Sequence, residues 1–257
     1  MAREGKINKV RVPMREQKVE ERIRNFRSVP LGYSEEEAVR EAERCLQCKN
    51  PKCEANCPVN LKVREVIRAI VEKDFEKAFF IAKEDNPIPA ITGRVCPQED
   101  QCEGACVVGK VGDAINIGKL IAFVADRARE RGIEEEVKIE ERPEKVAVIG
   151  SGPAGISCAN DLRKAGFQVT IFEALHLPGG VLTYGIPAFR LPKDVVNYEL
   201  DFIQKIGVKI ELNTIVGQNI SFSELRKEFD AVFIGTGAGA PIFMGIEGEK
   251  LMGVYSA

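Results

Sequence analysis

The spacing of the cysteines constrains this chain more than any other feature. Seven of its eight cysteines fall within residues 45–106. They are arranged as two groups, Cys45-x2-Cys48-x4-Cys53-x3-Cys57-Pro58 and Cys96-Pro97-x4-Cys102-x3-Cys106. Thiols that are merely buried need no such spacing. The pattern therefore favours a fold that gathers these sulfur atoms for a chemical purpose.

The first group is close to the bacterial ferredoxin pattern C-x2-C-x2-C-x3-C-P. In that pattern three neighbouring thiolates hold one iron–sulfur cluster, and the fourth cysteine binds the other cluster. We expect the same exchange here. One cluster would be held by Cys45, Cys48, Cys53 and Cys106. A second cluster would be held by Cys57, Cys96 and Cys102.

Three other interpretations compete with iron–sulfur ligation. Four-thiolate zinc sites also contain C-x2-C pairs. Zinc pairs are separated by a spacer, however, whereas four cysteines crowd into residues 45–57 here and a proline follows the last. A disulfide framework suits small secreted domains, and the N-terminal sequence MAREGKINKV lacks the apolar region of a signal peptide. Buried free thiols are the third alternative. Iron–sulfur ligation is favoured, with zinc second.

The bulk composition argues against several classes of protein. The 37 basic and 39 acidic residues give a net charge of −2, without the basic excess of a nucleic-acid-binding protein. No apolar run approaches the roughly 18 residues that a membrane-spanning helix needs. Clustered cysteines fit metal ligation in a reducing compartment better than disulfides. We therefore expect a cytoplasmic protein of one or two domains, with no nucleic-acid partner and no membrane span.

The residues before position 142 predict a helical domain. A capping box at Ser34 and Glu37 starts a helix that should run to residue 45. Apolar residues recur at helical spacing over residues 63–71. The prolines around Ile88 predict an extended loop. Further helices are predicted over residues 14–26, 75–82 and 118–132.

Beyond residue 143 the pattern changes to α/β. Residues 145–149 are a short apolar run typical of a buried parallel strand, and the glycine-rich sequence GSGPAG follows at once over residues 150–155. A helix over 156–165 and a strand over 168–172, ending at Glu173, complete a dinucleotide-binding unit. Its three glycines serve a tight turn, the approach of a pyrophosphate to the helix N-terminus, and close packing of helix on strand. An arginine usually binds the 2′-phosphate of a dinucleotide that carries one. The residue at this position is the acidic Glu173, which is placed to bind ribose hydroxyls, so the candidate dinucleotides are FAD and NAD.

The rest of the chain continues the α/β pattern. Residues 178–193 form a loop whose glycine pair indicates close approach of the backbone to a ligand. The strand over 231–234 ends in Gly235-Thr236-Gly237-Ala238. Small residues at the carboxyl end of a strand mark the place where open α/β sheets receive ligands. Other predicted elements are helices over residues 194–206 and 222–229 and a strand over 208–212.

Together these residues resemble the glutamate synthase small (β) subunit family. That family includes the N-terminal half of dihydropyrimidine dehydrogenase and the large subunit of the NADH-dependent ferredoxin:NADP oxidoreductase. The resemblance covers essentially the whole chain. Its markers are the cysteine array, Ile115-Asn116-Ile117-Gly118, the segment from Val148 to Gly155, Tyr184-Gly185-Ile186-Pro187 and Ile234-Gly235-Thr236-Gly237.

The resemblance implies a helical domain with two [4Fe–4S] clusters over residues 1–142. A partial Rossmann-like FAD-binding domain would follow over residues 143–257, without the NAD(P)H-binding insertion of the family. Electrons would pass between FAD and a partner redox subunit, such as a glutamate synthase large subunit or a ferredoxin-linked protein. A cluster-bearing docking subunit without catalysis is the alternative. The positions that match flavin contacts of the family are Gly150, Ser151, Gly152, Pro153, Ala154, Gly155, Glu173, Gly180, Val181, Arg190, Thr236 and Gly237.

Two departures from the family pattern stand out. The family's second cluster takes a Glu or Gln just after the Ile-Asn-Ile-Gly-x-Leu segment, but this position is Ile121 here, followed by Ala122. Neither side chain can bind iron, so the second cluster is expected to have three protein ligands. The second cluster would then have an open iron or a three-iron core, or its fourth ligand would come from solvent or from a partner. The second departure is that family members continue into an NAD(P)H-binding domain where this chain stops. No general acid or base is expected, and the only histidine, His176, is expected on the surface or beside the adenine.

Overall fold

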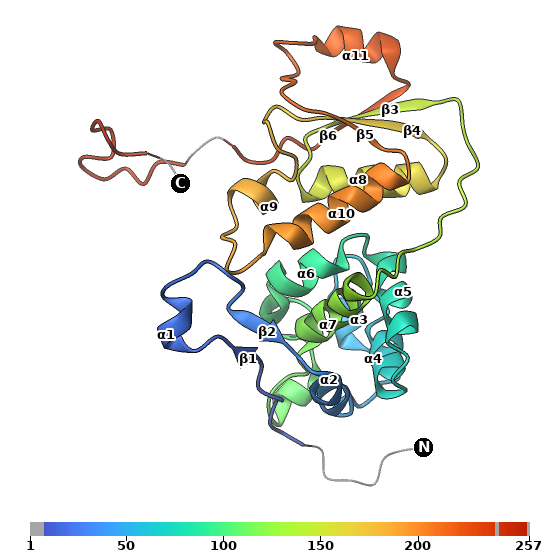
Figure 1. Ribbon diagram of the computed structural model, residues 1–257, viewed down its shortest axis with the longest axis vertical. Coiled ribbons are helices and arrows are strands. Elements are labelled where there is room, and N and C mark those ends of the chain that lie inside the picture. Colours follow the sequence, from blue (N-terminus) through green and yellow to red (C-terminus); the bar gives the residue numbers. More distant parts are fainter. Residues whose placement is uncertain (1–7, 240–241, 256–257) are drawn as a thin grey trace. The chain divides into compact units, whose positions relative to one another are not determined.

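The computed structural model describes residues 8–239 and 242–255 of the chain (Figure 1). Their contacts divide into two units. The first unit comprises Met1–Glu136 and Pro187–Glu199, and the second comprises Val137–Ile186 and Leu200–Ala257. Helices dominate the first unit and a parallel sheet the second, which confirms the predicted order of a helical domain followed by an α/β domain.

The first unit is organised around helix α7 (Ile117–Glu130), which contacts four other helices of this unit (Figure 1). Most of its residues are buried, including Leu120 and Val124, which are fully enclosed. The helices around α7 are α2 (Glu35–Ala42), α4 (Val63–Val71), α5 (Phe75–Asp85) and α6 (Pro89–Val95). Shorter elements are α1 (Val19–Arg22), α3 (Lys52–Ala55) and the 3₁₀ turns η1 (Gln98–Asp100) and η2 (Val107–Lys110).

Local sequence signals fix where two of these helices start. The predicted capping box at α2 is confirmed: the Glu37 N–H donates to the Ser34 hydroxyl at 3.2 Å, and the Ser34 N–H donates to the Glu37 carboxylate at 2.7 Å. Asp74 caps α5 by accepting from the N–H of Lys77 at 3.1 Å. Because α2 ends at Ala42, the first cysteines lie on the loop beyond it rather than on the predicted longer helix.

Two predictions for the first unit are wrong. Where an extended loop was expected around Ile88, helix α6 begins at Pro89. Proline is well suited to the first helical position because its φ is preset and its missing N–H is not needed there. The helix predicted over residues 14–26 is reduced to α1. In its place, β1 (Arg15–Glu16) pairs antiparallel with β2 (Pro30–Gly32). Helices in proteins are stabilised mainly by packing of an apolar face. The large apolar residues Ile23 and Phe26 are 72% and 77% exposed, so this segment has no such packing to stabilise a longer helix.

A buried polar network joins the N-terminal segment, α2 and the start of α7. Glu41 is fully buried, and its carboxylate accepts from the N–H groups of Val12 and Asn116, both at 2.8 Å, and from Arg44 at 2.5 Å. The Asn116 amide in turn donates to the Tyr33 hydroxyl at 2.7 Å. Burial raises the pKa of Tyr33 to about 12, so this hydroxyl stays a neutral partner. Buried polar groups that are all satisfied in this way hold a single arrangement of the elements they join.

The second unit is built on a four-stranded parallel sheet with strand order β5-β4-β3-β6. The central strands β3 (Lys145–Ile149) and β4 (Gln168–Phe172) have the predicted bounds. The outer strands are β5 (Lys209–Glu211) and β6 (Ala231–Ile234). The chain winds from β3 to β4 and β5 on one side and returns to place β6 on the other. The carboxyl ends of β3 and β6 therefore form the switch point, where open α/β sheets bind ligands.

Helices α8 (Pro153–Lys164) and α11 (Phe222–Glu228) cover opposite faces of this sheet (Figure 1). On the α11 side, a core cluster is formed by Ala147, Ile149, Phe172, Leu225 and Phe229. The loop predicted over residues 178–193 contains a short helix, α9 (Val181–Tyr184). Helix α10 (Lys193–Lys205) follows closely the predicted range. In the described part of the chain, no helix is both long and apolar enough to span a membrane.

Helices α6 and α7 cross at Gly93 with almost no space between their backbones. A Cβ atom added to Gly93 would lie 2.6 Å from the amide nitrogen of Ala122 and 2.8 Å from the carbonyl oxygen of Gly118. Any side chain at position 93 would therefore push the two helices apart. Cys96 follows Gly93 by less than one turn, so the crossing also fixes where the second cysteine group begins.

Replacing Gly93 with alanine tests this crossing. In an unconstrained helix, alanine would be favoured by about 1 kcal/mol. Here the added methyl group overlaps the backbone of α7, so we expect the free energy of unfolding to fall by about 1–3 kcal/mol in chemical denaturation. Gly109→Ala is the control, because its Cβ would meet nothing closer than 3.5 Å. Equal stability of the two variants would show that the crossing is not tight.

Candidate functional site

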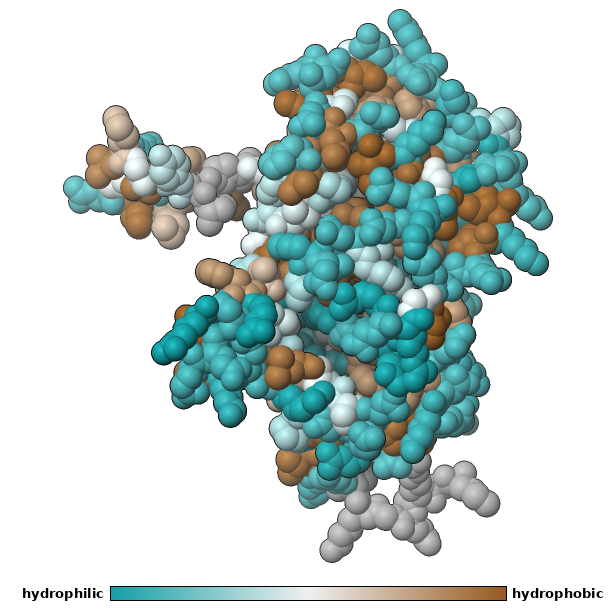
Figure 2. Space-filling view, viewed as in Figure 1, coloured by the Kyte–Doolittle hydropathy of each residue, from teal (hydrophilic) through white to brown (hydrophobic). Residues whose placement is uncertain are grey.

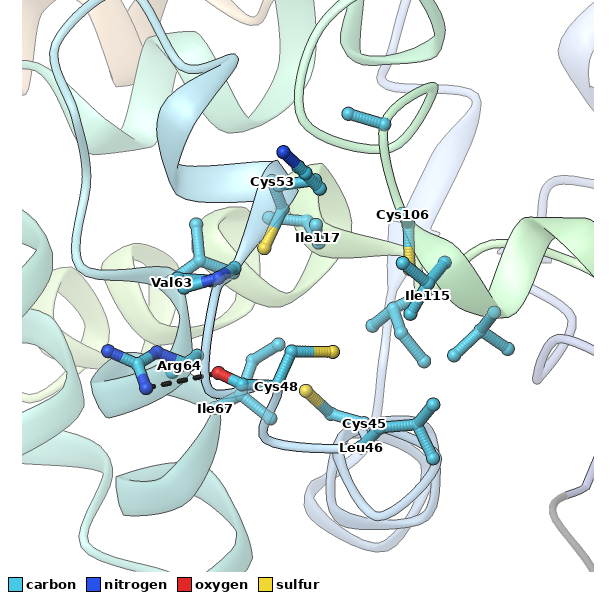
Figure 3. Close-up of a pocket in the computed structure, with 15 residues that line it drawn as sticks. Cys45, Leu46, Cys48, Cys53, Val63, Arg64, Ile67, Cys106, Ile115 and Ile117 are labelled. Atoms are coloured by element: carbon cyan, nitrogen blue, oxygen red, sulfur yellow. Dashed lines mark hydrogen bonds between the residues drawn. The ribbon is translucent and has the colours of Figure 1, made fainter.

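The first predicted cysteine set is gathered around one pocket of the first unit. Figure 3 shows the sulfur atoms of Cys45, Cys48, Cys53 and Cys106 directed toward a common space. They reach it from the loop after α2, from α3 and from the residue that precedes η2. The remaining lining is mainly apolar and includes Leu46, Val63, Ile67, Val108, Ile115 and Ile117.

Arg64 of α4 holds the loop that carries the first two of these thiols. Its guanidinium donates to the carbonyl oxygen of Cys48 at 3.1 Å and to the carboxylate of Glu54 at 3.3 Å (Figure 3 shows the first of these bonds). The Gln47 amide donates to the carbonyl oxygen of Arg64 at 3.2 Å and lies 3.7 Å from the sulfur of Cys45. These contacts position the thiols, and Arg64 and Lys52 are the charged residues of the pocket lining.

The electrostatics of this pocket suit a group that brings positive charge. Burial raises the pKa of the Cys53 thiol to about 11, and the charge of Cys45 acts in the same direction. The pKa of Cys45 is also raised, first by burial, with Cys106 and Cys48 adding to the shift. Apolar walls give a thiolate no stabilisation, whereas iron or zinc would supply it and displace the protons. The site therefore fits a thiolate-bound metal centre.

In the second predicted set, Cys57 lies near enough to Cys96 and Cys102 for its charge to act on both thiols. Burial raises the pKa of Cys96, and the charge of Cys57 adds to the effect. Burial raises the pKa of Cys102 to about 12, with Glu103 and Cys57 contributing next. Cys106 lines the pocket of the first set, and Cys57 acts electrostatically on the later cysteines, as the predicted exchange requires. Cys158 lies on α8 in the second unit and belongs to neither group.

At the second group, the position that holds a Glu or Gln in the family pattern offers no ligand, and the nearby polar side chains are already hydrogen-bonded. Ile121 and Ala122 are buried on α7, at 4% and 8% exposure. The Glu103 carboxylate already accepts from the N–H of Gly118 at 3.0 Å and from Arg11 at 2.8 Å. The Gln98 amide donates to the carbonyl oxygens of Thr92 and Gly93.

The arrangement of the thiols can be compared with that of a structural zinc site. Over residues 8–239 and 242–255, no three His, Cys, Asp or Glu side chains converge as ligands of a single metal ion. A structural zinc ion would draw four thiolates to about 2.3 Å from one point. The thiols of the first set instead surround an open space. Ligation itself stays a prediction for all seven cysteines.

In the second unit, the glycine-rich loop after β3 separates into two kinds of glycine. Gly150 has φ of +99°, and a Cβ there would overlap the carbonyl oxygen of Gly235. A Cβ on Gly155 would overlap the carbonyl oxygen of Gly150. Both glycines are thus required by the contacts of the protein itself. Gly152 has φ of −66°, and its Cβ would meet no atom within 4 Å. Only a ligand beside the N-terminus of α8 would require a glycine at this position.

Glu173, which is 6% exposed, holds the glycine-rich loop in place through hydrogen bonds. Its Oε2 accepts from the N–H of Ser151 at 2.9 Å and from the Ser151 hydroxyl, while its Oε1 accepts from the N–H of Leu175 at 2.9 Å. The Ser151 oxygen also accepts from the N–H of Gly179 at 2.9 Å. Sequence reasoning missed this anchoring role. A carboxylate offers about four acceptor positions, so these bonds leave room for a ribose hydroxyl. The ribose contact of Glu173 stays a prediction.

The other predicted flavin positions fall into two places. Most surround the glycine loop at the N-terminus of α8, namely Pro153, Ala154, Gly180, Val181, Thr236 and Gly237. Arg190 belongs to the first unit, where it lines a cavity together with Lys119. His176 is exposed, and its Nδ1 lies 3.3 Å from the Tyr184 hydroxyl. Flavin contact stays a prediction for all these residues.

Comparison with protein families divides the chain in the same order. Residues 22–133 match the family described as "Dihydropyrimidine dehydrogenase domain II, 4Fe-4S cluster". Residues 144–256 match the family described as "Pyridine nucleotide-disulphide oxidoreductase". The first match covers both cysteine groups, and the second covers the parallel sheet and its glycine loop.

Several curated proteins are similar over most of the chain. The glutamate synthase [NADPH] small chain of Escherichia coli (strain K12) is 34% identical over 253 residues, which are 98% of this chain and 52% of that protein. The putative oxidoreductase UacF of the same organism is 37% identical over 92% of this chain and 37% of that protein. The NAD-dependent dihydropyrimidine dehydrogenase subunit PreT of Escherichia coli (strain K12) is 38% identical over 80% of this chain and 51% of that protein.

The chain spans about half the length of the glutamate synthase small chains that it matches. The match to the Escherichia coli small chain covers 98% of this chain, so it extends across both family matches. The chain is therefore a homologue of the glutamate synthase small chains over most of its own length.

Proposed function

We propose that this chain is the flavin and iron–sulfur electron-transfer module of an NAD(P)H-linked oxidoreductase. FAD would exchange electrons with two [4Fe–4S]-type clusters and, through them, with a partner redox subunit. The observation that carries the proposal is the gathering of Cys45, Cys48, Cys53 and Cys106 around one pocket, which supports an exchange of Cys106 for Cys57 in the first group. This exchange is the ligation pattern of two-cluster ferredoxins.

A flavin and iron–sulfur clusters complement each other chemically. A flavin carries the hydride and one-electron chemistry itself, and the protein binds it, orients it and adjusts its electronics. The residues proposed to hold it are the glycine loop at Gly150 to Gly155, with Glu173 keeping that loop in place. The seven thiolates would hold the clusters, and the apolar wall around the first set would limit solvent access and so influence its potential. No proton donor is needed for electron relay between such groups.

The partner is proposed from the chemistry and from the names of relatives. Two relatives are named a small chain and a subunit, so they are parts of larger assemblies. We propose for this chain a redox partner of the same kind, such as a glutamate synthase large subunit or a ferredoxin-linked protein. Its final electron acceptor would be determined by that partner.

A cluster-bearing docking subunit without its own turnover is the second candidate. It is favoured by the apolar side chains exposed along residues 242–255 (Figure 2), where Ile242, Met252 and Tyr255 are 97%, 104% and 87% exposed. Exposed apolar patches of this kind mark interaction surfaces. Photoreduction of the bound FAD separates the candidates without a need for NAD(P)H. Electron transfer from the reduced flavin to the clusters of the isolated chain would support the electron-transfer function, and its absence would support the docking subunit.

Cysteine variants test the sorting of the ligands. Protein purified without air should contain about eight iron atoms and eight sulfides per chain, for two cubane clusters. Cys106→Ser should remove the electron paramagnetic resonance signal of the first cluster in reduced protein, and Cys57→Ser that of the second. Each should lower the iron content toward about four. Cys158→Ser, which removes a thiol outside both groups, is the control. Loss of the same cluster in both ligand variants would contradict the sorting.

Two alanine variants of the glycine loop test the dinucleotide site. Gly152→Ala should leave the free energy of unfolding unchanged or raise it by up to about 1 kcal/mol, because the methyl group meets no protein atom. It should nevertheless weaken FAD binding at least about tenfold, because the methyl group occupies the pyrophosphate position.

The matched variant Gly155→Ala should show the reverse order of effects. Its methyl group overlaps the backbone of the loop, so the free energy of unfolding should fall by about 1–3 kcal/mol. Flavin content by absorbance and unfolding by denaturant measure both quantities. A Gly152→Ala protein with its full flavin content would count against the site.

A further inference from the structure

The backbone is left-handed at Gln47, which lies between the first two cysteines of the first set. Its φ is +52°. Glycine, asparagine and aspartate adopt this region most readily, and a residue such as glutamine pays a cost in free energy there. Strained backbone of this kind persists where the surrounding structure holds it, and it often accompanies a functional site. The contacts that hold Gln47 are therefore informative.

The side-chain amide of Gln47 is held against the sulfur of Cys45. Its Nε2 donates to the carbonyl oxygen of Arg64 at 3.2 Å and to the sulfur of Cys45 at 3.7 Å. Arg64 also donates to the carbonyl oxygen of Cys48 at 3.1 Å. Helix α4 thus fixes both the loop that carries the two thiols and the amide beside one of them.

The backbone of Gln47 acts on the same sulfur. Burial raises the pKa of the Cys45 thiol, whereas hydrogen bonds from the backbone N–H and from the side-chain amide of Gln47 lower it. Within residues 8–239 and 242–255, no other thiol of the first set accepts a hydrogen bond from a side chain. Cys45 is therefore distinguished from its neighbours by this amide.

The carbonyl oxygen of the amide indicates which end of the side chain is needed. Gln47 Oε1 is buried and has no hydrogen-bond partner in the described part of the chain. An unsatisfied buried acceptor is costly. Turning the amide over would place this oxygen against the carbonyl oxygen of Arg64, which is also an acceptor. The arrangement therefore keeps the N–H donors beside the sulfur of Cys45.

Gln47 acts from outside the pocket. The lining contains its neighbours Leu46 and Cys48 but not Gln47 itself. The amide therefore meets the sulfur of Cys45 without entering the space that the four thiols surround. Groups that hydrogen-bond to a metal ligand in this way orient the ligand and tune the metal.

We propose that Gln47 is a positioning residue of the first cluster, whose side-chain amide donates to the Cys45 thiolate and raises the reduction potential of the cluster that this thiolate would hold. The inference rests on the proposed function, because it requires that cluster. Reduction by one electron from the flavin adds one negative charge, part of which falls on the thiolate sulfurs. An N–H donor stabilises that charge, so the hydrogen bond favours the reduced state.

A redox titration of the anaerobically purified full chain tests this hydrogen bond. The protein is equilibrated with dithionite and redox mediators, and the electron paramagnetic resonance signal of the first cluster is followed against potential. This signal is the one that Cys106→Ser removes. Gln47→Met and Gln47→Gly both remove the amide. Each should lower the ratio of reduced to oxidised first cluster about tenfold at a given potential, which is a shift of about 59 mV to more negative potential.

Two comparisons make the result specific. The potential of the second cluster should not change in either Gln47 variant. Asn213→Gly is the matched control, because Asn213 is an exposed carboxamide residue of the second unit with φ of +55°. It loses an amide from the same kind of backbone without a thiol contact, and it should leave both potentials unchanged.

Gln47→Gly also separates tuning from a purely structural role. Glycine suits a left-handed backbone, so the denaturation midpoint should stay close to that of the natural chain while the potential falls. A purely structural residue would show the reverse, with lost stability and an unchanged potential. If Gln47→Met does not fold, Gln47→Gly still decides the matter.

The outcomes separate the two proposals. Protein without iron and sulfide would overturn the proposed function and this inference together. Protein that contains both clusters, but in which Gln47→Gly leaves the potential of the first cluster unchanged, would overturn this inference alone. An equal shift of both clusters, or a shift that Asn213→Gly reproduces, would do the same.

Discussion

The close crossing of α6 and α7 is the contact on which both cysteine groups depend. Helix α6 ends at Val95, so the crossing at Gly93 fixes the direction in which the chain leaves toward Cys96. The Gln98 amide donates back to the carbonyl oxygen of Gly93, which holds η1 against the same point. At the other end, Ile115 and Ile117 line the first pocket just before α7 begins its crossing. One backbone contact therefore links the walls of both sites.

The network around Glu41 completes this linkage. Glu41 lies on α2, three residues before Arg44 and four before Cys45, and its carboxylate accepts from the N–H of Asn116 at 2.8 Å. The carbonyl oxygens of Asp113 and Ala114 accept from Arg44 at 2.5 and 3.4 Å. The loop that carries the first cysteines is thus attached to the segment that follows Cys106. This attachment explains physically how a cysteine some sixty residues away in sequence can join the first group.

The sequence predicted what depends on neighbouring residues and missed what depends on distant ones. The capping box at Ser34, the strand ending at Ile149 and the glycine loop are local patterns, and each appears in the structure as predicted. The α6 helix was missed because two prolines normally interrupt a helix, and only the register of Pro89 at its first position makes the second one compatible. The predicted helix over residues 14–26 failed because strand pairing with distant residues outweighed a weak local preference.

The candidate sites divide in the same way. Cysteine spacing predicted that Cys106 would lie with the first group, as the pocket shows, because the ferredoxin pattern already encodes an exchange between distant parts of the chain. The ligation of both sets stays a prediction. Glycine spacing predicted the loop after β3, but not that Glu173 would anchor Ser151 from beneath it. The cavity that Arg190 and Lys119 line gave no sequence signal at all. Its cations come from α6, from α7 and from the segment after Ile186, and each alone resembles an ordinary surface charge.

The deeply buried charges of the first unit are paired. Arg44 meets Glu41 at 2.5 Å, Lys83 meets Glu199 at 2.7 Å, and Glu103 meets Arg11 at 2.8 Å. Removing one partner of such a pair leaves a costly buried charge. Lys119 is half-buried on α7, and most of the other residues of this helix are buried.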